Sequence, residues 1–398
     1  MQGWIPALIL GIAALLGAVF LYNTVGRGHR ASLIVLGAGA LTGVAGALLF
    51  MLPLNFCTFE QEHDIIDQVF GVLLIAIGMA ITLLPARWVL TRLLNKQSFL
   101  AVDASPGAFK GIILPFVFLA PTLIILAVFL YYPSLETFRL STLLARLGAP
   151  RTAFVCVDNF TRLVDDSTYF NTVVVTLLIS LAIVVIGLIL SLFVAVLAYQ
   201  PVKGARIYRT LLIWPYAISP VVAGVIFLLM FNPTGGIINY GLDSVFGIQI
   251  PWLNDPSVAP WAVILASVWK SMGYNILFYI AGLQNVPKDL LEAASIDGAN
   301  LVRRFLQITI PLLSPITFFL VITNLTYAFF ETFGTIDYLT GGGPLNSTTT
   351  MMYRIYQIGI RNNDLGKAAA ESIILFVMVI GLTVIQFRTS GNQVTYGA

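Results

Sequence analysis

The chain has 398 residues, of which 58% are hydrophobic and only 10% are charged, and its mean hydropathy is +0.92. A soluble domain carries about 25% charged residues. The composition therefore excludes soluble enzymes, disordered proteins and nucleic-acid-binding proteins, and it indicates a membrane protein. The net charge of +3 is small, and two cysteines are too few for a disulfide scaffold.

Nine apolar segments are long enough to cross a bilayer, whose core is spanned by about 20 apolar residues of helix. No segment alternates apolar and polar residues as a barrel strand does, so we expect an all-α polytopic membrane protein. The predicted spans are residues 4–22, 31–52, 68–90, 111–132, 170–199, 207–231, 260–282, 311–331 and 370–387.

The first apolar segment could be a secretory signal or a retained helix. It has no basic residue before it and no clear small-residue cleavage site after it, and Arg27 and Arg30 follow it. These features favour a retained transmembrane helix.

Basic residues predict the side that each loop faces, because cytoplasmic loops are enriched in Lys and Arg. If the N-terminus is outside and the C-terminus is cytoplasmic, 13 of the 21 basic residues lie inside and seven lie outside, while Lys270 lies within a span. Only this orientation places most of the basic residues on the cytoplasmic side. The inner set is Arg27, Arg30, Arg87, Arg92, Lys96, Lys110, Lys203, Arg206, Arg209, Lys288, Arg303, Arg304 and Arg388.

A few residues of the predicted loops invite a metal or redox interpretation. His29 and His63 fall on opposite sides of the membrane, which excludes a metal-binding histidine pair in this topology. Cys57 and Cys156 both fall outside, where an oxidising compartment permits a disulfide but does not require one. The acidic run at residues 60–67 is most simply a solvated loop rather than a cation site.

The inner segment 283–310 is longer than a simple connection needs, and its residues predict two short helices. Pro287 suits the first position of a helix and Asp289 suits its first turn. Gly298 permits the break that ends this helix, and Asn300 can cap a second one.

Small and charged residues give this inner segment the character of a docking surface. Ala293 and Ala294 let another protein approach closely, and Glu292 supplies a charge for a basic partner residue. Arg303 and Arg304 can extend toward lipid headgroups or a partner. The alternative is an amphipathic helix resting on the membrane, which usually has bulky apolar anchors and a basic polar face.

The spacing of this segment resembles the EAA loop of ABC-importer permeases. Glu292-Ala293-Ala294 is followed by Gly298 and then by Ile308 and Ile310-Pro311, and Ile310 is the one mild departure, since the family has Leu there. The resemblance implies that the loop couples the chain to an ATPase. The residues assigned to coupling are Glu292, Ala293, Ala294, Asp297, Gly298, Arg303, Ile308 and Pro311.

Three further stretches, 324–333, 342–344 and 348–356, look like the carbohydrate-uptake branch of this family, of the maltose and sn-glycerol-3-phosphate type. Within that branch the pattern is similar to the first permease subunit of glycerol-3-phosphate importers. The likeness covers residues 111–388 and implies a six-helix type I permease core. Residues 1–110 would then be an extension with three extra helices, and residues 389–398 a tail.

The resemblance also implies the partners of the chain. They are a cytoplasmic ABC ATPase dimer that binds ATP and magnesium, a second homologous permease, an extracytoplasmic solute-binding protein and the lipid of the inner membrane, but no nucleic acid. The chain itself is expected to bind no cofactor and to be no enzyme. Its only Gly-Lys, Gly366-Lys367, lacks the other residues of a phosphate-binding loop.

Polar residues inside spans are costly and usually face the bundle interior or a water-filled path. Lys270 can attract a phosphate or bond sugar hydroxyls, or it can neutralise an acid or carbonyl between helices. The aromatic rings of Trp214, Tyr216 and Trp269 can stack on a sugar or serve packing and interfacial belts. Two sets of polar residues share a helical face, Ser267, Lys270 and Tyr274 on one span and Asn324, Tyr327 and Glu331 on another.

These features together predict a permease subunit of a binding-protein-dependent, ATP-driven importer, which moves a sugar, polyol or sugar phosphate by alternating access. sn-Glycerol-3-phosphate is one candidate solute. The alternative is a secondary transporter driven by an ion gradient, which predicts intramembrane carboxylates and inverted repeats that are not evident here. An intramembrane enzyme would need a catalytic set within the spans, and the sequence offers none.

Overall fold

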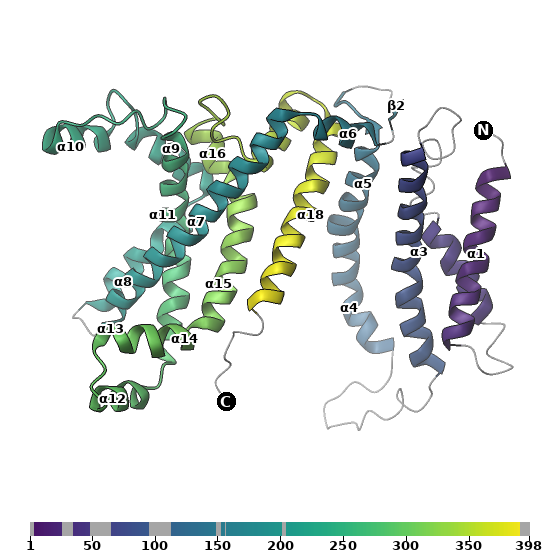
Figure 1. Cartoon of the computed structure of the whole chain (residues 1–398), viewed down its shortest axis with the longest axis horizontal. Coiled ribbons are helices and arrows are strands. Elements are labelled where there is room, and N and C mark those ends of the chain that lie inside the picture. Colours follow the sequence, from purple (N-terminus) through teal and green to yellow (C-terminus); the bar gives the residue numbers. More distant parts are fainter. Residues whose placement is uncertain are drawn as a thin grey trace. The chain divides into compact units, whose positions relative to one another are not determined.

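A computed structural model of the chain describes residues 4–25, 35–47, 65–94, 113–148, 153–155, 157–200 and 204–390 (Figure 1). These residues are nearly all helical. Turns and loops join the helices, and one antiparallel pair of two-residue strands is present, β1 (Leu143–Leu144) and β2 (Ala153–Phe154). The chain divides into unit 1, residues 1–162 and 363–370, and unit 2, residues 163–362 and 371–398. The histidines and cysteines weighed above lie outside the described residues.

Within the described residues, four helices are long and apolar enough to cross a membrane, judged by length and composition. Two further pairs of helices pass the same test but are bent, and three shorter apolar helices precede them in the chain. The prediction of an all-α membrane protein is confirmed. The four long helices are Phe118–Ser141, Ser167–Tyr199, Ala259–Gln284 and Leu365–Arg388.

Unit 1 begins with helices that approach each other closely because glycines face one another. Its first three helices are α1 (Trp4–Val25), a short helix (Val35–Ala47) and α3 (Ile65–Leu94). A Cβ atom on Gly17 would lie 2.2 Å from the carbonyl oxygen of Gly39, and one on Gly43 would lie 2.3 Å from that of Ala13. Small residues of this kind let transmembrane helices pack backbone to backbone.

The fourth predicted span, 111–132, is longer in the structure than expected. It comprises α4 (Ile113–Leu126), the π-helical segment η1 (Ala127–Tyr131) and α5 (Tyr132–Ser141). The helix thus continues nine residues beyond the predicted end, and its most apolar window contains no buried residue.

The polypeptide after α5 is tied to the start of the last helix, α18 (Leu365–Ser390). The amide nitrogen of the Asn159 side chain, on α6 (Asp158–Val164), donates to the carbonyl oxygens of Ser141 and Leu143 at 2.8 and 3.1 Å. A Cβ atom on Gly366 would lie 2.0 Å from the Leu143 carbonyl oxygen. Only glycine therefore allows this approach, which accounts for Gly366 without any phosphate-binding role.

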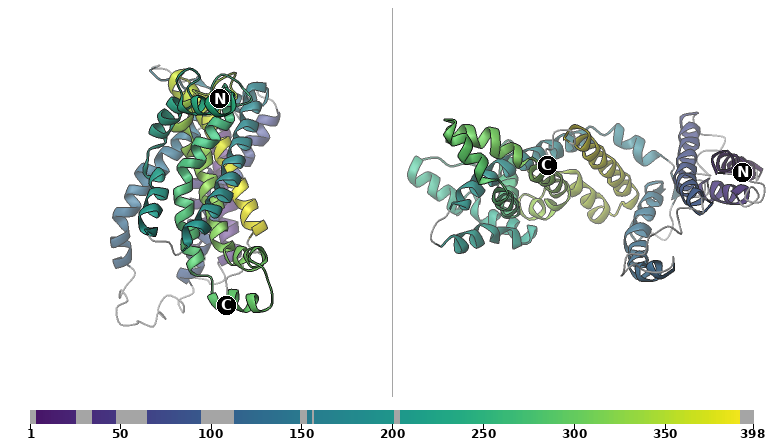
Figure 2. Two further views of the ribbon diagram at one scale, coloured as in Figure 1. Left: turned by 90° about the vertical axis from the view of Figure 1, so that its left-hand side faces the viewer. Right: turned by 90° about the horizontal axis from the view of Figure 1, so that it is seen from below.

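Unit 2 contains the main hydrophobic core and most of the helices (Figure 2). Its long helices α7 and α11 pack side by side and contribute the fully buried Ile183 and Ile276. The elements that start in unit 2 are α7 (Ser167–Tyr199), α8 (Ala205–Ile213), η2 (Trp214–Ala217), α9 (Pro220–Met230), α10 (Ile237–Phe246), α11 (Ala259–Gln284), α12 (Lys288–Ile296), α13 (Leu301–Arg304), η3 (Phe305–Thr309), α14 (Ile310–Leu312), α15 (Ser314–Thr326), η4 (Tyr327–Glu331), α16 (Phe333–Leu339), α17 (Met351–Tyr356) and η5 (Gln357–Arg361).

Two predicted spans of unit 2 are bent rather than continuous. The span expected at 207–231 is wrong as a single helix, because Ile207–Ala217 and Pro220–Met230 meet at 101°. Ile218 and Ser219 are extended there, as the position before a proline favours. A second break, of 66°, separates Leu301–Leu312 from Ser314–Glu331.

A buried ion network joins three helices of unit 2. Arg354 of α17 pairs with Asp166, the N-cap of α7, at 2.5 Å and with Glu371 of α18 at 3.0 Å. Glu371 is fully buried. Burial opposes ionisation of Asp166, yet the hydrogen bond and charge of Arg354, together with backbone N–H donors, lower the pKa of this carboxyl to about 2. The two carboxylates thus share one guanidinium.

We expect Gly366→Ala to lower the stability of the protein by about 1–3 kcal/mol, because the new methyl group overlaps the Leu143 carbonyl. The thermal midpoint of the purified chain in detergent measures this. Gly381→Ala, on the same helix with nothing within 4 Å of the added atom, is the matched control and should leave the midpoint unchanged. Equal midpoints for the two variants would contradict the observed contact.

We expect Arg354→Met to destabilise the protein by about 3–5 kcal/mol, because it removes a buried guanidinium that two carboxylates share. Thermal unfolding followed by circular dichroism measures the loss. Arg361→Met removes a guanidinium that is half exposed and pairs with Asp337 at 2.8 Å. That control should cost less than about 1 kcal/mol, and a comparable cost would argue against the network.

Candidate functional site

The segment between α11 and α15 forms the two predicted short helices. α12 begins at Lys288, with Pro287 at its N-cap rather than at its first helical position, and Asp289 lies in its first turn. Gly298 has φ +82° and ends the helix, and the Ala299 N–H donates to the Ala294 carbonyl at 2.9 Å. This glycine is needed because other residues adopt a positive φ only at a cost.

Asn300 caps the second helix of the segment, as its sequence position predicts. Its side-chain oxygen accepts from the Arg303 N–H at 2.8 Å. Arg303 remains exposed and its Nε donates to Gln307 at 3.0 Å, but Arg304 turns back and donates to the Leu291 carbonyl at 3.3 Å. Arg304 therefore ties the two helices together instead of reaching away from them.

The two helices protrude at one end of unit 2 and present apolar side chains (Figures 1 and 2). Ile296 is 87% exposed and Leu301 is 77% exposed, and Glu292 and Ala293 are exposed beside them. An exposed apolar patch with a charged rim is typical of a protein interface. Of the other residues assigned to coupling, Asp297 and Pro311 are exposed, whereas Ala294 and Ile308 are half-buried.

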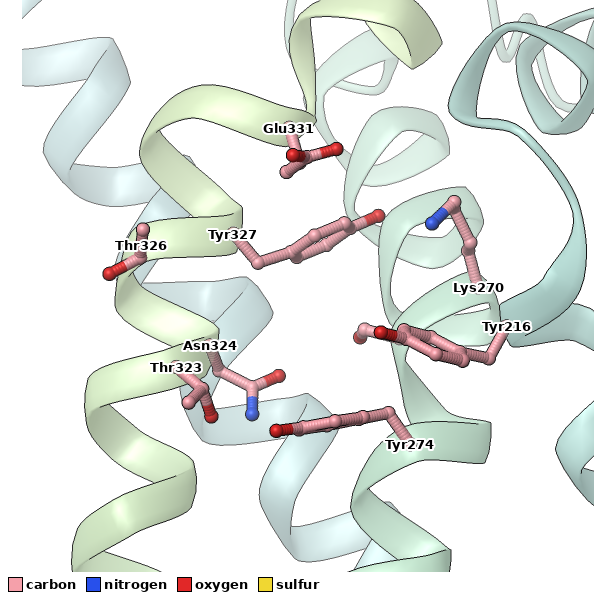
Figure 3. A pocket seen from close by; sticks show the side chains of 9 residues that line it. Tyr216, Lys270, Tyr274, Thr323, Asn324, Thr326, Tyr327 and Glu331 are labelled. Atoms are coloured by element: carbon pink, nitrogen blue, oxygen red, sulfur yellow. The ribbon is translucent and has the colours of Figure 1, made fainter. Parts of the chain in front are cut away.

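A polar cavity of about 440 Å³ lies in the helix bundle of unit 2 (Figure 3). It is partly open and combines hydroxyl, amide and charged groups. Five of the six residues predicted for a substrate path line it, while Ser267 is fully buried and is not a lining residue. The lining residues are Tyr216, Lys270, Ser271, Tyr274, Thr323, Asn324, Thr326, Tyr327 and Glu331.

Lys270 of α11 is the one basic residue among those lining the cavity, and it is only 6% exposed. Its Nζ lies 5.5 Å from the centre of the Tyr216 ring and 5.2 Å from that of Tyr327. Figure 3 shows the ammonium group and the Tyr327 hydroxyl pointing toward one another across the cavity. The ammonium thus rests between aromatic faces, an arrangement that stabilises a cation.

Asn324 plays a structural part as well as lining the cavity. It forms a reciprocal amide pair with Asn275, in which each Nδ2 donates to the other Oδ1, at 2.6 and 3.0 Å. Both residues are buried, so the pair joins α15 to α11 beneath the cavity. The sequence pattern placed Asn324 on the right face but gave no reason to connect it with Asn275.

One wall of the cavity depends on a change of helix type, and its Tyr327 and Glu331 lie in the upper part of the view in Figure 3. α15 ends at Thr326 and continues as the π-helix η4, which carries Tyr327 and Glu331. A π-helix shifts the following side chains round the axis, which is frequent at functional sites. Thr323 and Thr326 also line the cavity although sequence analysis had not selected them. Trp214 and Trp269 do not line it, whereas Tyr216 does.

The described residues contain no group of three or more His, Cys, Asp or Glu side chains that could hold a metal ion. What they do combine is a bundle of apolar helices, a polar cavity within it, and a protruding pair of helices with exposed apolar side chains. These features define a polytopic membrane protein of the transporter class.

Comparison with known proteins identifies the family. The model for "binding-protein-dependent transport system inner membrane component" matches residues 187–389. The chain is 44% identical over 295 residues to the sn-glycerol-3-phosphate transport system permease protein of Yersinia enterocolitica, which covers 74% of this chain and 100% of that one. The corresponding protein of Agrobacterium fabrum is 43% identical over 73% of this chain and 98% of its own length.

Two solved structures share the fold at low sequence identity. One is a bacterial ABC transporter involved in import of the acidic polysaccharide alginate, with a TM-score of 0.61 and 22% identity over 70% of this chain and 95% of that chain. The other is a bacterial alginate ABC transporter in complex with an alginate pentasaccharide-bound periplasmic protein. It has a TM-score of 0.63 and 21% sequence identity, and the match covers 72% of this chain and 96% of that chain.

The chain belongs to the family of binding-protein-dependent transport system inner membrane components. It is an inner-membrane permease subunit of an ABC importer, and the predicted fold class, family resemblance and transport function are confirmed. The roles assigned to individual residues, the domain boundaries at 110 and 388 and the orientation of the termini stay predictions.

Proposed function

We propose that this chain forms half of a solute pathway that a cytoplasmic ATPase dimer drives and an extracytoplasmic solute-binding protein loads. A second homologous permease would complete the pathway, and ATP and magnesium would bind to the ATPase. The curated relatives at 44% and 43% identity, named as transport system permeases, support this assembly. So does the name of a structural relative in complex with a periplasmic protein.

The observation that carries the proposal is the position of the exposed helix pair between the two helices that line the cavity. α11 ends at Gln284, and α12 begins four residues later. At the other end, α13 continues through η3 and α14 into α15. A partner that displaces α12 and α13 would therefore move both walls of the cavity.

The cavity supports an anionic polyol as the solute, with sn-glycerol-3-phosphate as the specific proposal. Lys270 supplies one positive charge for a phosphate group. The cavity is also lined by hydroxyl groups that can bond the hydroxyls of a polyol, those of Tyr216, Tyr274, Thr323 and Thr326. The names of the relatives agree with this solute class.

The proposed orientation places the N-terminus outside and α12 in the cytoplasm, as the distribution of basic residues favours. Residues 1–110 would form an extension with three transmembrane helices before the permease core at 111–388, with a tail at 389–398. The family model begins at residue 187, and the relative from Yersinia enterocolitica aligns over its whole length with 74% of this chain. Both matches support an added segment.

We expect Gly298→Val to uncouple ATP hydrolysis from solute binding. A β-branched residue at φ +82° is strained, although nothing lies within 4 Å of the added atom, so the strain should shift α13 relative to α12 without a clash. The readout is the ATPase rate of the reconstituted importer, with and without the loaded binding protein. Stimulation should fall at least about tenfold if the strain displaces the docking surface.

Gly247→Val is the matched control for that experiment. Gly247 also follows a helix at positive φ, +66°, with open space around it, but it lies after α10 at the other end of unit 2. In this variant the loaded binding protein should still stimulate the ATPase rate. In Glu292→Lys, as in Gly298→Val, that stimulation should be lost. Normal stimulation in assembled Gly298→Val complexes, or solute accumulation by the chain without an ATPase, would contradict the proposal.

We expect Lys270→Met to reduce transport of sn-glycerol-3-phosphate by about 10- to 100-fold, the value of one charge-assisted hydrogen bond of about 1.5–3 kcal/mol. Uptake by proteoliposomes is measured at saturating binding protein, so that the pathway and not delivery limits the rate. Lys270→Arg keeps the charge and should retain most of the activity. An unchanged rate in Lys270→Met would remove Lys270 from the substrate path.

A further inference from the structure

The helix α10 (Ile237–Phe246) leaves an apolar face uncovered by the rest of the described chain. It joins α9 to α11 at the end of unit 2 opposite α12, and Figure 1 shows that it lies across the direction of the neighbouring helices. Ile237, Tyr240 and Val245 lie on one half of this helix, with Gly241 and Ser244 between them, and are 68%, 76% and 70% exposed, while Phe246 at its last turn is 69% exposed on the other half. Exposed apolar side chains grouped in this way mark an interaction surface.

The opposite side of α10 holds the helix in place. Asn239 is buried, and its side chain donates to the Ile250 carbonyl at 2.9 Å. Its oxygen accepts from the Ile250 N–H at 3.3 Å and from the Trp252 indole N–H at 3.1 Å. The Trp252 ring in turn lies 4.8 Å from that of Phe231. These hydrogen bonds and this ring contact fix the rotation of α10 about its own axis. The direction of its apolar face is therefore set by the fold.

The surroundings of α10 indicate lipid rather than water or an acidic partner as what covers this face. No Lys or Arg occurs between Arg209 and Lys270, and the loop from 232 to 258 carries only Asp243 and Asp255 as charges. Asp243 lies off the apolar face, so the face itself has no charge to pair with a partner protein. Its composition of two aliphatic residues and one tyrosine suits an apolar phase with a polar boundary.

The apolar surface also continues onto the neighbouring helices. On α9, exposed Val222, Val225 and Leu229 are spaced i, i+3 and i+7 and form an outward stripe that leads toward α10. On the first turns of α11, Trp261 is exposed as well. Tyr and Trp are enriched where a membrane meets water. The face of α10 is therefore continuous with the membrane-embedded surface of the two helices that it connects.

We propose that α10 is an interfacial helix, whose Ile237, Tyr240 and Val245 insert between the lipids at the outer surface of the membrane. Helices of this kind lie in the plane of the interface with their apolar side toward the acyl chains. Many of them also have a basic polar face, but α10 contains no Lys or Arg, so its apolar side chains alone would hold it there. Because Asn239 ties α10 to the loop that leads into α11, the helix would set the depth at which the outer ends of α9 and α11 stand in the bilayer.

Fluorescence quenching tests the proposal on the full importer in phosphatidylcholine nanodiscs. Cys57 and Cys156 are replaced by serine, and Tyr240→Cys is labelled with an environment-sensitive dye. Phosphatidylcholine with a nitroxide on its acyl chain should remove about half of the fluorescence, because the probe would lie at the depth of the upper acyl chain. Aqueous iodide should have little effect. Asn254→Cys, at an exposed polar position of the same loop, is the control and should show the reverse.

Two results would overturn the proposal. Quenching of the Tyr240→Cys label by iodide and not by the nitroxide lipid would show that the face is in water. Protection from both quenchers would show that protein covers it, and repeating the measurement without the binding protein would tell whether that protein or the second permease does so. None of these outcomes depends on which solute is transported.

Discussion

The fold depends on one constraint, which is that polar groups buried among apolar helices must find their partners inside the protein. Unit 2 meets this constraint for its most strongly polar buried groups with a few long-range pairs, whereas some buried hydroxyls, such as that of Ser191, have no hydrogen-bond partner among the described residues. Asn275 and Asn324 satisfy each other between α11 and α15, and Arg354 neutralises Asp166 and Glu371 at the ends of α7 and α18. Each pair joins two different helices, with partners up to 188 residues apart in sequence, so the same contacts that satisfy the polar groups also fix which helices are neighbours.

Local features were predictable from the sequence, because their causes lie within a few residues. Gly298 ends α12 and Asn300 caps α13, since a helix end depends on its own turn. The faces of α11 and α15 were likewise found from helical spacing, and five of the six selected residues line the cavity. The bend of the span at 207–231 was missed although Pro220 signals it, because a long apolar run alone indicates a straight helix.

Long-range contacts could not be predicted in this way. Nothing near Asn275 in the sequence points to Asn324, and the partners of Arg354 lie 188 and 17 residues away. Gly366 is a similar case, since its role appears only when the Leu143 carbonyl is placed beside it. Spacing along one helix predicts which residues share a face, but the element that this face meets depends on the whole fold.

In unit 2, the exposed helices α12 and α13 are connected to the two helices that line the cavity. α12 and α13 are joined by covalent connections to α11 and α15, and Arg304 holds the two short helices together through the Leu291 carbonyl. Beneath the cavity, the Asn275–Asn324 pair joins α11 to α15 again. The two cavity walls are therefore linked at both levels, so displacement of the helix pair should move them as one body rather than separate them.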